Sequence, residues 1–395
     1  MMIYRLDVEL PNGFAPTPYK ISDYYSLERA EAVNNAGTLT VELPIAYLNA
    51  PFAPDRPDLI LCVMEKFGNY PWRLSRQTKW FVQSVEIRFD GTKFFLVVKA
   101  IDAIGLLLRR TVPYYAPNTQ TGFTGSSQSN IASTFADDMI KGIIRTNLGT
   151  LATDYTQTTP ASLVPLRSLS SSLFSVDANV GLAPTVGAKA ISWRNGLLAP
   201  CQEIASDAAQ LGTYLAYDVV WTGATLTFRT FINQRGRLRN LVRSARPVNL
   251  SPENGLATAS LLFDYTNEYN SIYCAGQGEG NERIIQQAYD ATRIGRSPFA
   301  LREAFTDSRN GGTTAAAVLA DAQTALRQGR PLQQFTATLS ETPTFRYGVD
   351  GDAAFGDIVS ANFVGYQFDV MLEQVATSVK AGQPAQHSVN LRSVL

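Results

Sequence analysis

The sequence predicts a mainly β protein with helical insertions, arranged as two similar β-domains that are each interrupted by a helical segment. Runs with the two-residue alternation of β-strands dominate both ends of the chain, whereas three segments have helical spacing. The order of strands and turns near the N-terminus also recurs near the C-terminus. At 395 residues, the chain is longer than one hydrophobic core usually serves.

The first β-domain begins with residues 1–113. Apolar and polar residues alternate along Thr38–Leu43, which is typical of a half-buried strand. The clearest hairpin turns at Asp90-Gly91, a dipeptide that supplies the positive φ of a type I′ turn. Its first arm alternates apolar with charged residues: Val85, Glu86, Ile87, Arg88 and Phe89.

Residues 114–199 read as an inserted accessory domain because Pro-, Ser-, Thr- and Gly-rich stretches surround a single helical pattern. The helix is predicted after Ser129, a cap candidate, with apolar residues at helical spacing. These apolar residues are Ile131, Phe135, Met139 or Ile140, and Ile143.

The first β-domain resumes over residues 200–245. A helix is predicted from Gln202 to Leu211, followed by Gly212 as its C′ residue. Two alternating strands follow and turn near Gly223. An arginine-rich connector then ends at Pro247, where we place a domain boundary.

The second β-domain is predicted over residues 246–300 and 331–395, with a helical insertion at 301–330. The inserted helix covers about Thr314–Gln328 and is stopped by Gly329. The strand Gln334–Ser340 alternates cleanly. Strands near Asp357 and Leu372 and a turn at Ala381-Gly382 match the order of strands around the Asp90-Gly91 turn.

Composition excludes several classes of function. Lys+Arg and Asp+Glu both number 34, so no net charge attracts DNA or an anionic membrane. Only 17% of residues are charged, which suggests that other subunits cover part of the surface. The only histidine, His387, rules out a His-rich metal site. The N-terminal residues form no signal peptide, so we expect an intracellular product.

The remaining chemical motifs are weak, and we predict no catalytic residues, no cofactor and no metal. His387 lacks the context of a catalytic triad, and the three cysteines, at positions 62, 201 and 274, read as buried thiols. Asp350, Asp352 and Asp357 suit Asx turns better than a calcium loop. Glu279 and Glu282 would be the kind of carboxylate pair that a glycosidase needs, but any acid-rich chain offers such pairs.

Two motifs keep a structural interpretation. The glycines of Gly276-Gln277-Gly278-Glu279-Gly280 predict a bulged passage from strand to loop with positive φ. The arginine-rich connector has two interpretations: a subunit-docking or phosphate patch, or a solvated linker whose arginines pair with nearby acids. The candidate patch residues are Arg235, Arg237 and Arg239.

Several segments together resemble the baseplate hub proteins of long-tailed, siphovirus-type bacteriophages. The resemblance runs through nearly the whole chain, with 113–200 as the poorest match. The most specific segment, Asn267–Arg283, resembles that family's strand leading into a G-x-G-E-G-x-x-R stretch, with Gly276, Gly278, Glu279, Gly280 and Arg283 at its specified positions. The other matching segments are Tyr25–Arg29, Asn35–Pro44, Ala100–Arg110 and Leu226–Thr230.

The resemblance implies a structural role without enzymatic activity. The two β-domains would be tube-like antiparallel β-barrels, and three copies would form a pseudo-sixfold ring that continues the tail tube. The implied partners are other copies of the chain, the distal tail protein ring, the tape-measure protein and tip or receptor-binding proteins, with indirect contact to the host surface. DNA would pass without specific binding. The implied location is the tail tip of the virion, after assembly in the host cytoplasm.

We further expect the Asp90-Gly91 hairpin and the strands beginning near Gln334 and Leu372 to line or brace the channel. Two other functions remain open. One is a tail-associated enzyme that degrades cell wall or polysaccharide, and the other is the hub of a contractile-tail injection machine.

Overall fold

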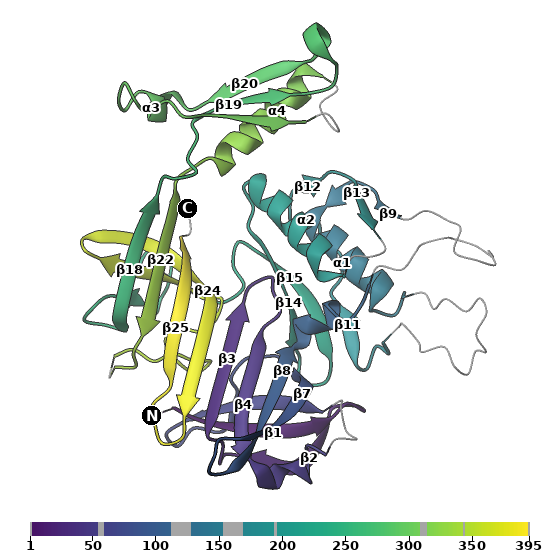
Figure 1. Cartoon of the computed structure of the whole chain (residues 1–395), viewed down its shortest axis with the longest axis vertical. Helices are drawn as coiled ribbons and strands as arrows, with labels where there is room; N and C mark the ends of the chain where they lie inside the picture. Colours follow the sequence, from purple (N-terminus) through teal and green to yellow (C-terminus); the bar gives the residue numbers. More distant parts are fainter. Residues whose placement is uncertain are drawn as a thin grey trace, which may run out of the picture. The chain divides into compact units, whose positions relative to one another are not determined.

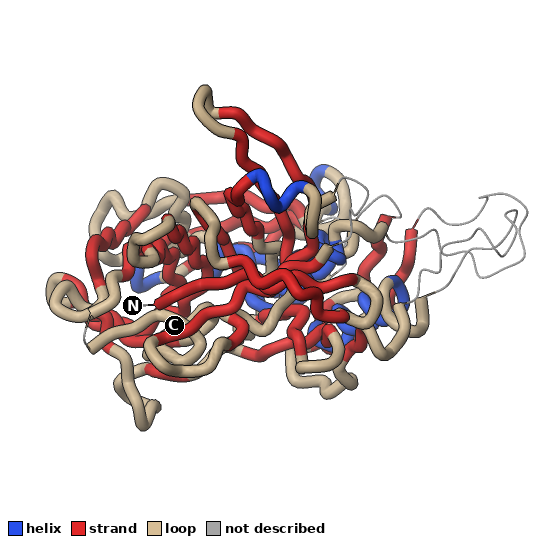
Figure 2. The backbone as a smooth tube through the Cα atoms, turned by 90° about the horizontal axis from the view of Figure 1, so that it is seen from below, coloured by secondary structure: helices blue, strands red, loops and turns tan. Residues whose placement is uncertain are grey.

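The computed structural model describes residues 2–53, 59–111, 128–152, 169–192, 196–308, 314–342 and 344–393. Strands are the predominant regular structure of this backbone and far exceed the helices (Figure 2), so the mainly β prediction is confirmed. The chain divides into two compact units. Unit 1 comprises Met1–Ala209, Thr213–Ala259 and Thr336–Leu395, and unit 2 comprises Gln210–Gly212 and Ser260–Phe335. No helix among the described residues is both long and apolar enough to cross a bilayer.

The principal sheet has 15 strands drawn from both ends of the chain (Figure 1). Its main path runs β18-β22-β25-β24-β3-β4-β8-β7-β5-β1-β2, while β6, β16, β17 and β23 branch from it. The N-terminal strands are β1 (Met2–Leu10), β2 (Ala15–Ile21), β3 (Ser26–Ala32), β4 (Thr38–Pro44), β5 (Ile60–Phe67), β6 (Arg73–Leu74), β7 (Trp80–Phe89) and β8 (Phe94–Asp102). The others are β16 (Leu238–Arg239), β17 (Asn249–Leu250), β18 (Leu256–Asp264), β22 (Leu332–Leu339), β23 (Ile358–Phe363), β24 (Tyr366–Lys380) and β25 (Gln386–Ser393).

The two predicted β-domains share this sheet, because β3 pairs with β24 in antiparallel register, Arg29 opposite Thr377. The path has two ends, β18 and β2, so closure into a barrel is not seen among the described strands. The predicted division into two tube-like domains with two insertions therefore stays a prediction. Alternation along Thr38–Leu43 is confirmed, since Leu39, Val41 and Leu43 are buried in the core under the sheet.

The helical part of unit 1 covers a small sheet in the order β11-β15-β14. Helices α1 (Ala136–Asn147) and α2 (Leu198–Gln210) pack on β14 (Leu215–Trp221) and β15 (Leu226–Ile232) through a shared apolar core that includes Ile140, Ile204 and Phe228. The predicted second helix and the hairpin at Gly223 are confirmed. The remaining strands here are β9 (Gln128–Ile131), β10 (Thr134–Phe135), β11 (Phe174–Val176), β12 (Thr185–Val186) and β13 (Lys189–Ser192).

The prediction for the start of the first helix is wrong. Ser129 and Ile131 lie in β9, where they pair with β13, and the helix begins only at Ala136. The backbone of 128–131 is hydrogen-bonded to a strand about 60 residues further along the chain. The spacing of apolar residues within a short segment cannot reveal such a distant partner. The Asp137 carboxylate accepts the N–H of Ala183 at 3.1 Å, so an acid of the first turn fixes the nearby loop.

Unit 2 is a three-stranded sheet, β20-β19-β21, with α4 on one face (Figure 1). Its elements are β19 (Ser271–Ala275), β20 (Ile285–Tyr289), β21 (Glu303–Asp307), α3 (Ala291–Ile294) and α4 (Ala315–Gln328), with a 3₁₀ turn at Gly280–Glu282. The prediction of α4 is confirmed: the Thr314 hydroxyl accepts the Ala317 N–H, and Val318 and Ala322 face the sheet.

Candidate interaction surfaces

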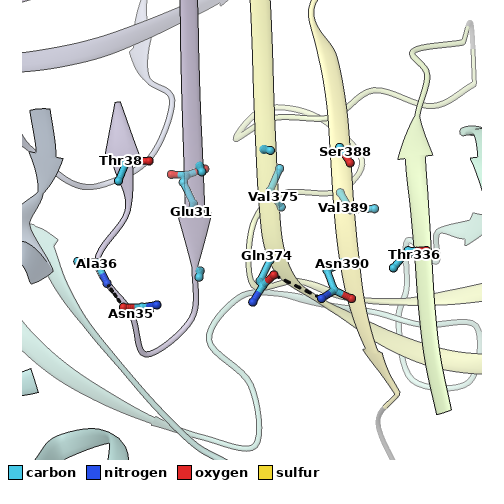
Figure 3. A pocket seen from close by; sticks show the side chains of 13 residues that line it. Glu31, Asn35, Ala36, Thr38, Thr336, Gln374, Val375, Ser388, Val389 and Asn390 are labelled. Atoms are coloured by element: carbon cyan, nitrogen blue, oxygen red, sulfur yellow. Dashed lines mark hydrogen bonds between the residues drawn. The ribbon is translucent and has the colours of Figure 1, made fainter. Parts of the chain in front are cut away.

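A shallow groove of about 420 Å³ lies across the outer face of β3, β24 and β25 (Figure 3). Residues facing outward there are small or neutral, including Ala30, Gln374, Ala376 and Ser388. Gln374 accepts a hydrogen bond from the Asn390 amide at 3.3 Å, so even the larger polar groups are partly satisfied. Glu31 is the one charged residue that lines the groove.

The carboxylate of Glu31 does not serve this groove, because it belongs to a buried ion network inside unit 1. Arg76 is at its centre and lies 2.9 Å from Asp102, 2.9 Å from Asp218 and 3.4 Å from Glu31. These groups come from four separate segments of the chain, so the network holds the small helical sheet and the principal sheet together. Removing any one partner would leave a buried charge uncompensated.

The carboxylates of this network respond differently to burial. Burial raises the pKa of Asp102 to about 6, although Arg76 opposes the shift. Burial also acts to raise the pKa of Asp218, but Arg235 and Arg76 together hold that pKa below its ordinary value. The side chains of Asp102 and Asp218 are at most 1% exposed, so a substrate cannot reach this pair of acids.

The arginine connector contributes to the same interior. Arg235 pairs with Asp218, and its side chain is largely buried. Arg237 lies 2.8 Å from Asp357, while Arg239 donates to the Arg246 carbonyl at 3.5 Å. Arg235 thus pairs with an acid, as the linker interpretation expected, but its side chain is largely buried and not solvated. A docking patch stays a prediction for Arg237 and Arg239.

The predicted hairpin is formed by β7 and β8, but its turn differs from the prediction. The loop has four residues, 90–93, and Gly91 alone among them has a positive φ, +93°, whereas a type I′ turn needs two such residues. The Asp90 carboxylate accepts the N–H groups of Thr92 and Lys93, each at 2.9 Å. Its side chain therefore stabilises a wider loop than the dipeptide rule implies. A role of Asp90 and Gly91 beside a channel stays a prediction.

The glycine-rich motif closes the hairpin between β19 and β20. Gly278 has φ +105°, and a Cβ there would lie 2.5 Å from the Glu282 carbonyl oxygen, so only glycine fits. Gly280 also has positive φ, as expected. Arg283 donates to the Gly276 carbonyl at 3.2 Å and pairs with Asp307 at 2.8 Å. Glu279 and Glu282 are exposed on this loop. The motif thus shapes a turn and ties it to β21.

The histidine, the cysteines and Asp352 have structural surroundings. His387 is buried in β25 beside Thr377, 3.1 Å away, and burial lowers its pKa to about 3. The three cysteines are buried free thiols, as predicted, and burial raises the pKa of each of them. Asp352 accepts the N–H of Arg346, six residues before it, which is not the bond of an Asx turn, so the predicted turn stays a prediction. Among the described residues, no group of three potential ligands could hold a metal ion.

Sequence reasoning missed the buried network because its members look like surface charges. Asp218 carried one available signal, since it interrupts the apolar strand Leu215–Trp221. Asp102 carries a similar signal, because it interrupts the apolar run Ala100–Ile104, whereas Arg76 has no distinctive local context.

The comparisons with known proteins identify the family. The Siphovirus ReqiPepy6 Gp37-like protein family matches residues 19–391. The chain belongs to this family. It is a bacteriophage tail protein, located in the tail of the virion, as the resemblance implied. Among curated proteins, no match was found.

Solved structures share the fold of this family member over its whole length. The 43 kDa tail protein of prophage MuSo2 from Shewanella oneidensis is 10% identical, with a TM-score of 0.60 over 99% of this chain and 98% of that one. A tail protein from Neisseria meningitidis MC58 is 12% identical, with a TM-score of 0.58 over 98% and 96%. The lidded Francisella PdpA-VgrG complex is 12% identical, with a TM-score of 0.55 over 100% of this chain and 52% of that one.

Proposed function

We propose that this tail protein is the hub of the tail tip. Three copies form a pseudo-sixfold ring that continues the tail tube, and its lumen passes the tape-measure protein and then DNA. The distal tail protein ring lies above, and tip or receptor-binding proteins attach below. Family membership and a fold shared over the full length with phage tail proteins support this role, which requires no enzymatic activity.

The groove on the outer face of β3, β24 and β25 carries the proposal, because the residues that line it are nearly free of charge. Exposed charges on the same face, Glu28, Lys380 and Arg392, lie outside the groove lining. A tail conduit must not retain DNA, since each cation held against a phosphate adds affinity. Ala30, Ala376 and Ser388 present no charge and little contact area to a passing polymer. The one acid that lines the groove, Glu31, is turned into the ion network and neutralised there. This face therefore suits the wall of a lumen, and it includes the strand predicted to begin near Leu372.

The mass of the assembled protein tests the hub. We expect three times 43.2 kDa for the purified chain at high concentration and for the hub released from tails. Native mass spectrometry of both samples measures it. A monomer in both samples would overturn the proposal, and turnover of cell-wall substrate by that monomer would favour the enzymatic alternative.

A hub from a contractile-tail injection machine is the second candidate. The likeness to a VgrG-containing complex favours it at the level of the fold. The siphovirus family match supports the hub of a long, non-contractile tail as the first candidate. Electron micrographs of the particle separate the two, because only a contractile tail carries a sheath.

A further inference from the structure

Among the described residues, the far half of β7 has a strand neighbour on one side only. Near its start, β7 pairs with β5 at Ile60 opposite Phe81 and Leu61 opposite Trp80. Beyond Val82, the described residues place only β8 beside it. A register shift between Val82 and Ser84 marks a bulge where β7 parts from β5, while β8 stays paired with β4. Every residue of β7 from Gln83 to Phe89 is exposed.

The direction of the backbone groups follows from the turn. The Asp90 N–H donates to the Lys93 carbonyl at 3.3 Å, which makes 90 and 93 a hydrogen-bonded pair. Such pairs alternate with non-bonded pairs along an antiparallel ladder. The N–H and C=O groups of Val85, Ile87 and Phe89 therefore point away from β8, toward the open edge.

The same three residues carry exposed apolar side chains. Val85 is 37% exposed, Ile87 53% and Phe89 58%. Opposite them, Leu96 and Val98 of β8 are buried, so the apolar face of the core continues outward along β7. An edge with free donors and apolar side chains pairs readily with another strand unless it is protected.

The edge strand β2, at one end of the sheet, is protected against pairing with another strand. Pro16 and Pro18 lie in β2, and proline removes donors from a ladder. β7 has no proline from Gln83 to Phe89, and its two charges, Glu86 and Arg88, bind each other at 2.9 and 3.0 Å. These charges therefore present no net repulsion to an incoming strand.

We propose that residues 83–89 of β7 pair with β18 of a second copy of this chain. β18 is the other end of the principal sheet and contains no proline, lysine, arginine or glutamate. Ala257, Ser260 and Leu262 are exposed along it. Two different edges on one chain make a head-to-tail contact, and head-to-tail contacts that close generate rings. This inference rests on the proposed ring and names the strands that close it.

Hydrogen exchange on the assembled protein tests the pairing. In the trimer, we expect the outward amides of 83–89, those of Val85, Ile87 and Phe89, to exchange at least tenfold more slowly than in the monomer obtained by dilution. The same slowing is expected for outward amides of 256–264. Ile87→Pro removes an outward donor that β8 does not use, and Ile87→Lys places a charge on the edge. Both variants should fold normally by circular dichroism and should weaken trimer formation at least tenfold.

Val180→Lys is the control for Ile87→Lys. Val180 is a β-branched residue outside the hairpin, and its side chain is exposed to a similar extent, 58% against 53% for Ile87. It should assemble like the wild type. A trimer whose 83–89 amides exchange as fast as in the monomer would overturn the strand pairing and leave the hub intact. Protection of 83–89 without protection of 256–264 would overturn the choice of β18. Absence of any trimer would remove the hub proposal and this inference together.

Discussion

The principal sheet and the sheet of unit 2 each have a covered face and an open face, and the open faces differ sharply. In the groove on β3, β24 and β25 the open face carries small neutral residues such as Ala30, Ala376 and Ser388, whereas its charged residues Glu28, Lys380 and Arg392 lie outside the groove lining. On unit 2 the face away from α4 carries aromatic residues: Tyr273, Tyr289 and Phe305 are 38%, 62% and 61% exposed. Tyr273 lies directly between β20 and β21, opposite Gln287 and Phe305.

The difference in side-chain composition indicates different roles for the two open faces. Aromatic side chains supply much of the binding energy at protein interfaces, whereas alanine and serine supply little. The unit 2 face has the composition of a contact surface, whereas the groove on β3, β24 and β25 has the small neutral side chains that the proposed lumen wall requires. The fold provides both sheets, and the side chains decide their roles.

The buried sides of the two sheets differ as well, since unit 1 has an ion network there and unit 2 has an apolar core. We expect the largest effect from Arg76→Met, which removes the central cation of that network. The substitution leaves Glu31, Asp102 and Asp218 buried without their shared cation, so we expect a loss of about 3–5 kcal/mol of unfolding free energy. The covered face of unit 2 has an apolar core centred on Val318 and Ala322 instead. Urea denaturation of the purified protein measures the loss.

Arg73→Met is the control for that experiment. Arg73 lies in the same segment and pairs with Asp350 at 3.0 Å, but its side chain is 53% exposed. We expect a cost of about 0–1 kcal/mol, as for other surface pairs. Equal losses for the two variants would show that the Arg76 network does not hold unit 1 together.

Rising pH should weaken unit 1 by a smaller amount. Burial raises the pKa of Glu65 from 4.5 to about 7, against the opposing effect of Arg29. The folded chain therefore holds this proton to higher pH than the unfolded chain, so stability falls as pH rises from about 4.5 to 7. The expected loss is about 3 kcal/mol.

Glu65→Gln tests the source of this slope. The amide oxygen can still accept the Val349 N–H, which the Glu65 carboxylate accepts at 2.8 Å. We expect the variant to lose most of the pH dependence between pH 5 and 8, measured by thermal unfolding. Asp102 should retain a smaller part, because its pKa is also raised. In unit 2, hydrogen bonds from the Arg293 backbone and side chain lower the pKa of Asp290, so unit 2 should weaken on acidification instead. An unchanged slope in the variant would contradict the assignment to Glu65.

The open face of β24 should tolerate substitution with the smallest change in stability. Ala376→Lys adds a cation at an exposed strand position, and we expect less than about 0.5 kcal/mol of change in unfolding free energy. In particles, the added charges would face DNA and slow its ejection, with a stronger effect at low salt. Ejection at an unchanged rate at low salt would argue against a lumen at this face. Val180→Lys adds the same charge elsewhere and serves as the control.

The sequence alone determined the local elements of this protein. Alternating strands, the hairpin at Asp90-Gly91, the helix from Ala315 to Gln328 and the positive φ of Gly278 depend on residues close in the chain. Their periodicity and turn chemistry are therefore visible without the fold. The matching segments also identified the type of phage tail protein, because such motifs are local.

Only the tertiary structure decided which edges and charges are hidden. Arg76 and Asp218 are separated by 142 positions, and Arg29 meets Thr377 only because β3 pairs with β24. The start of α1 was misplaced for the same reason, since β9 pairs with distant β13. From the sequence alone, a charged residue is expected to be solvated, because its partners are far away in the chain. Likewise, a strand cannot be recognised as an edge strand until its neighbours in the sheet are known. Burial and pairing are properties of the assembled fold, so local pattern cannot specify them.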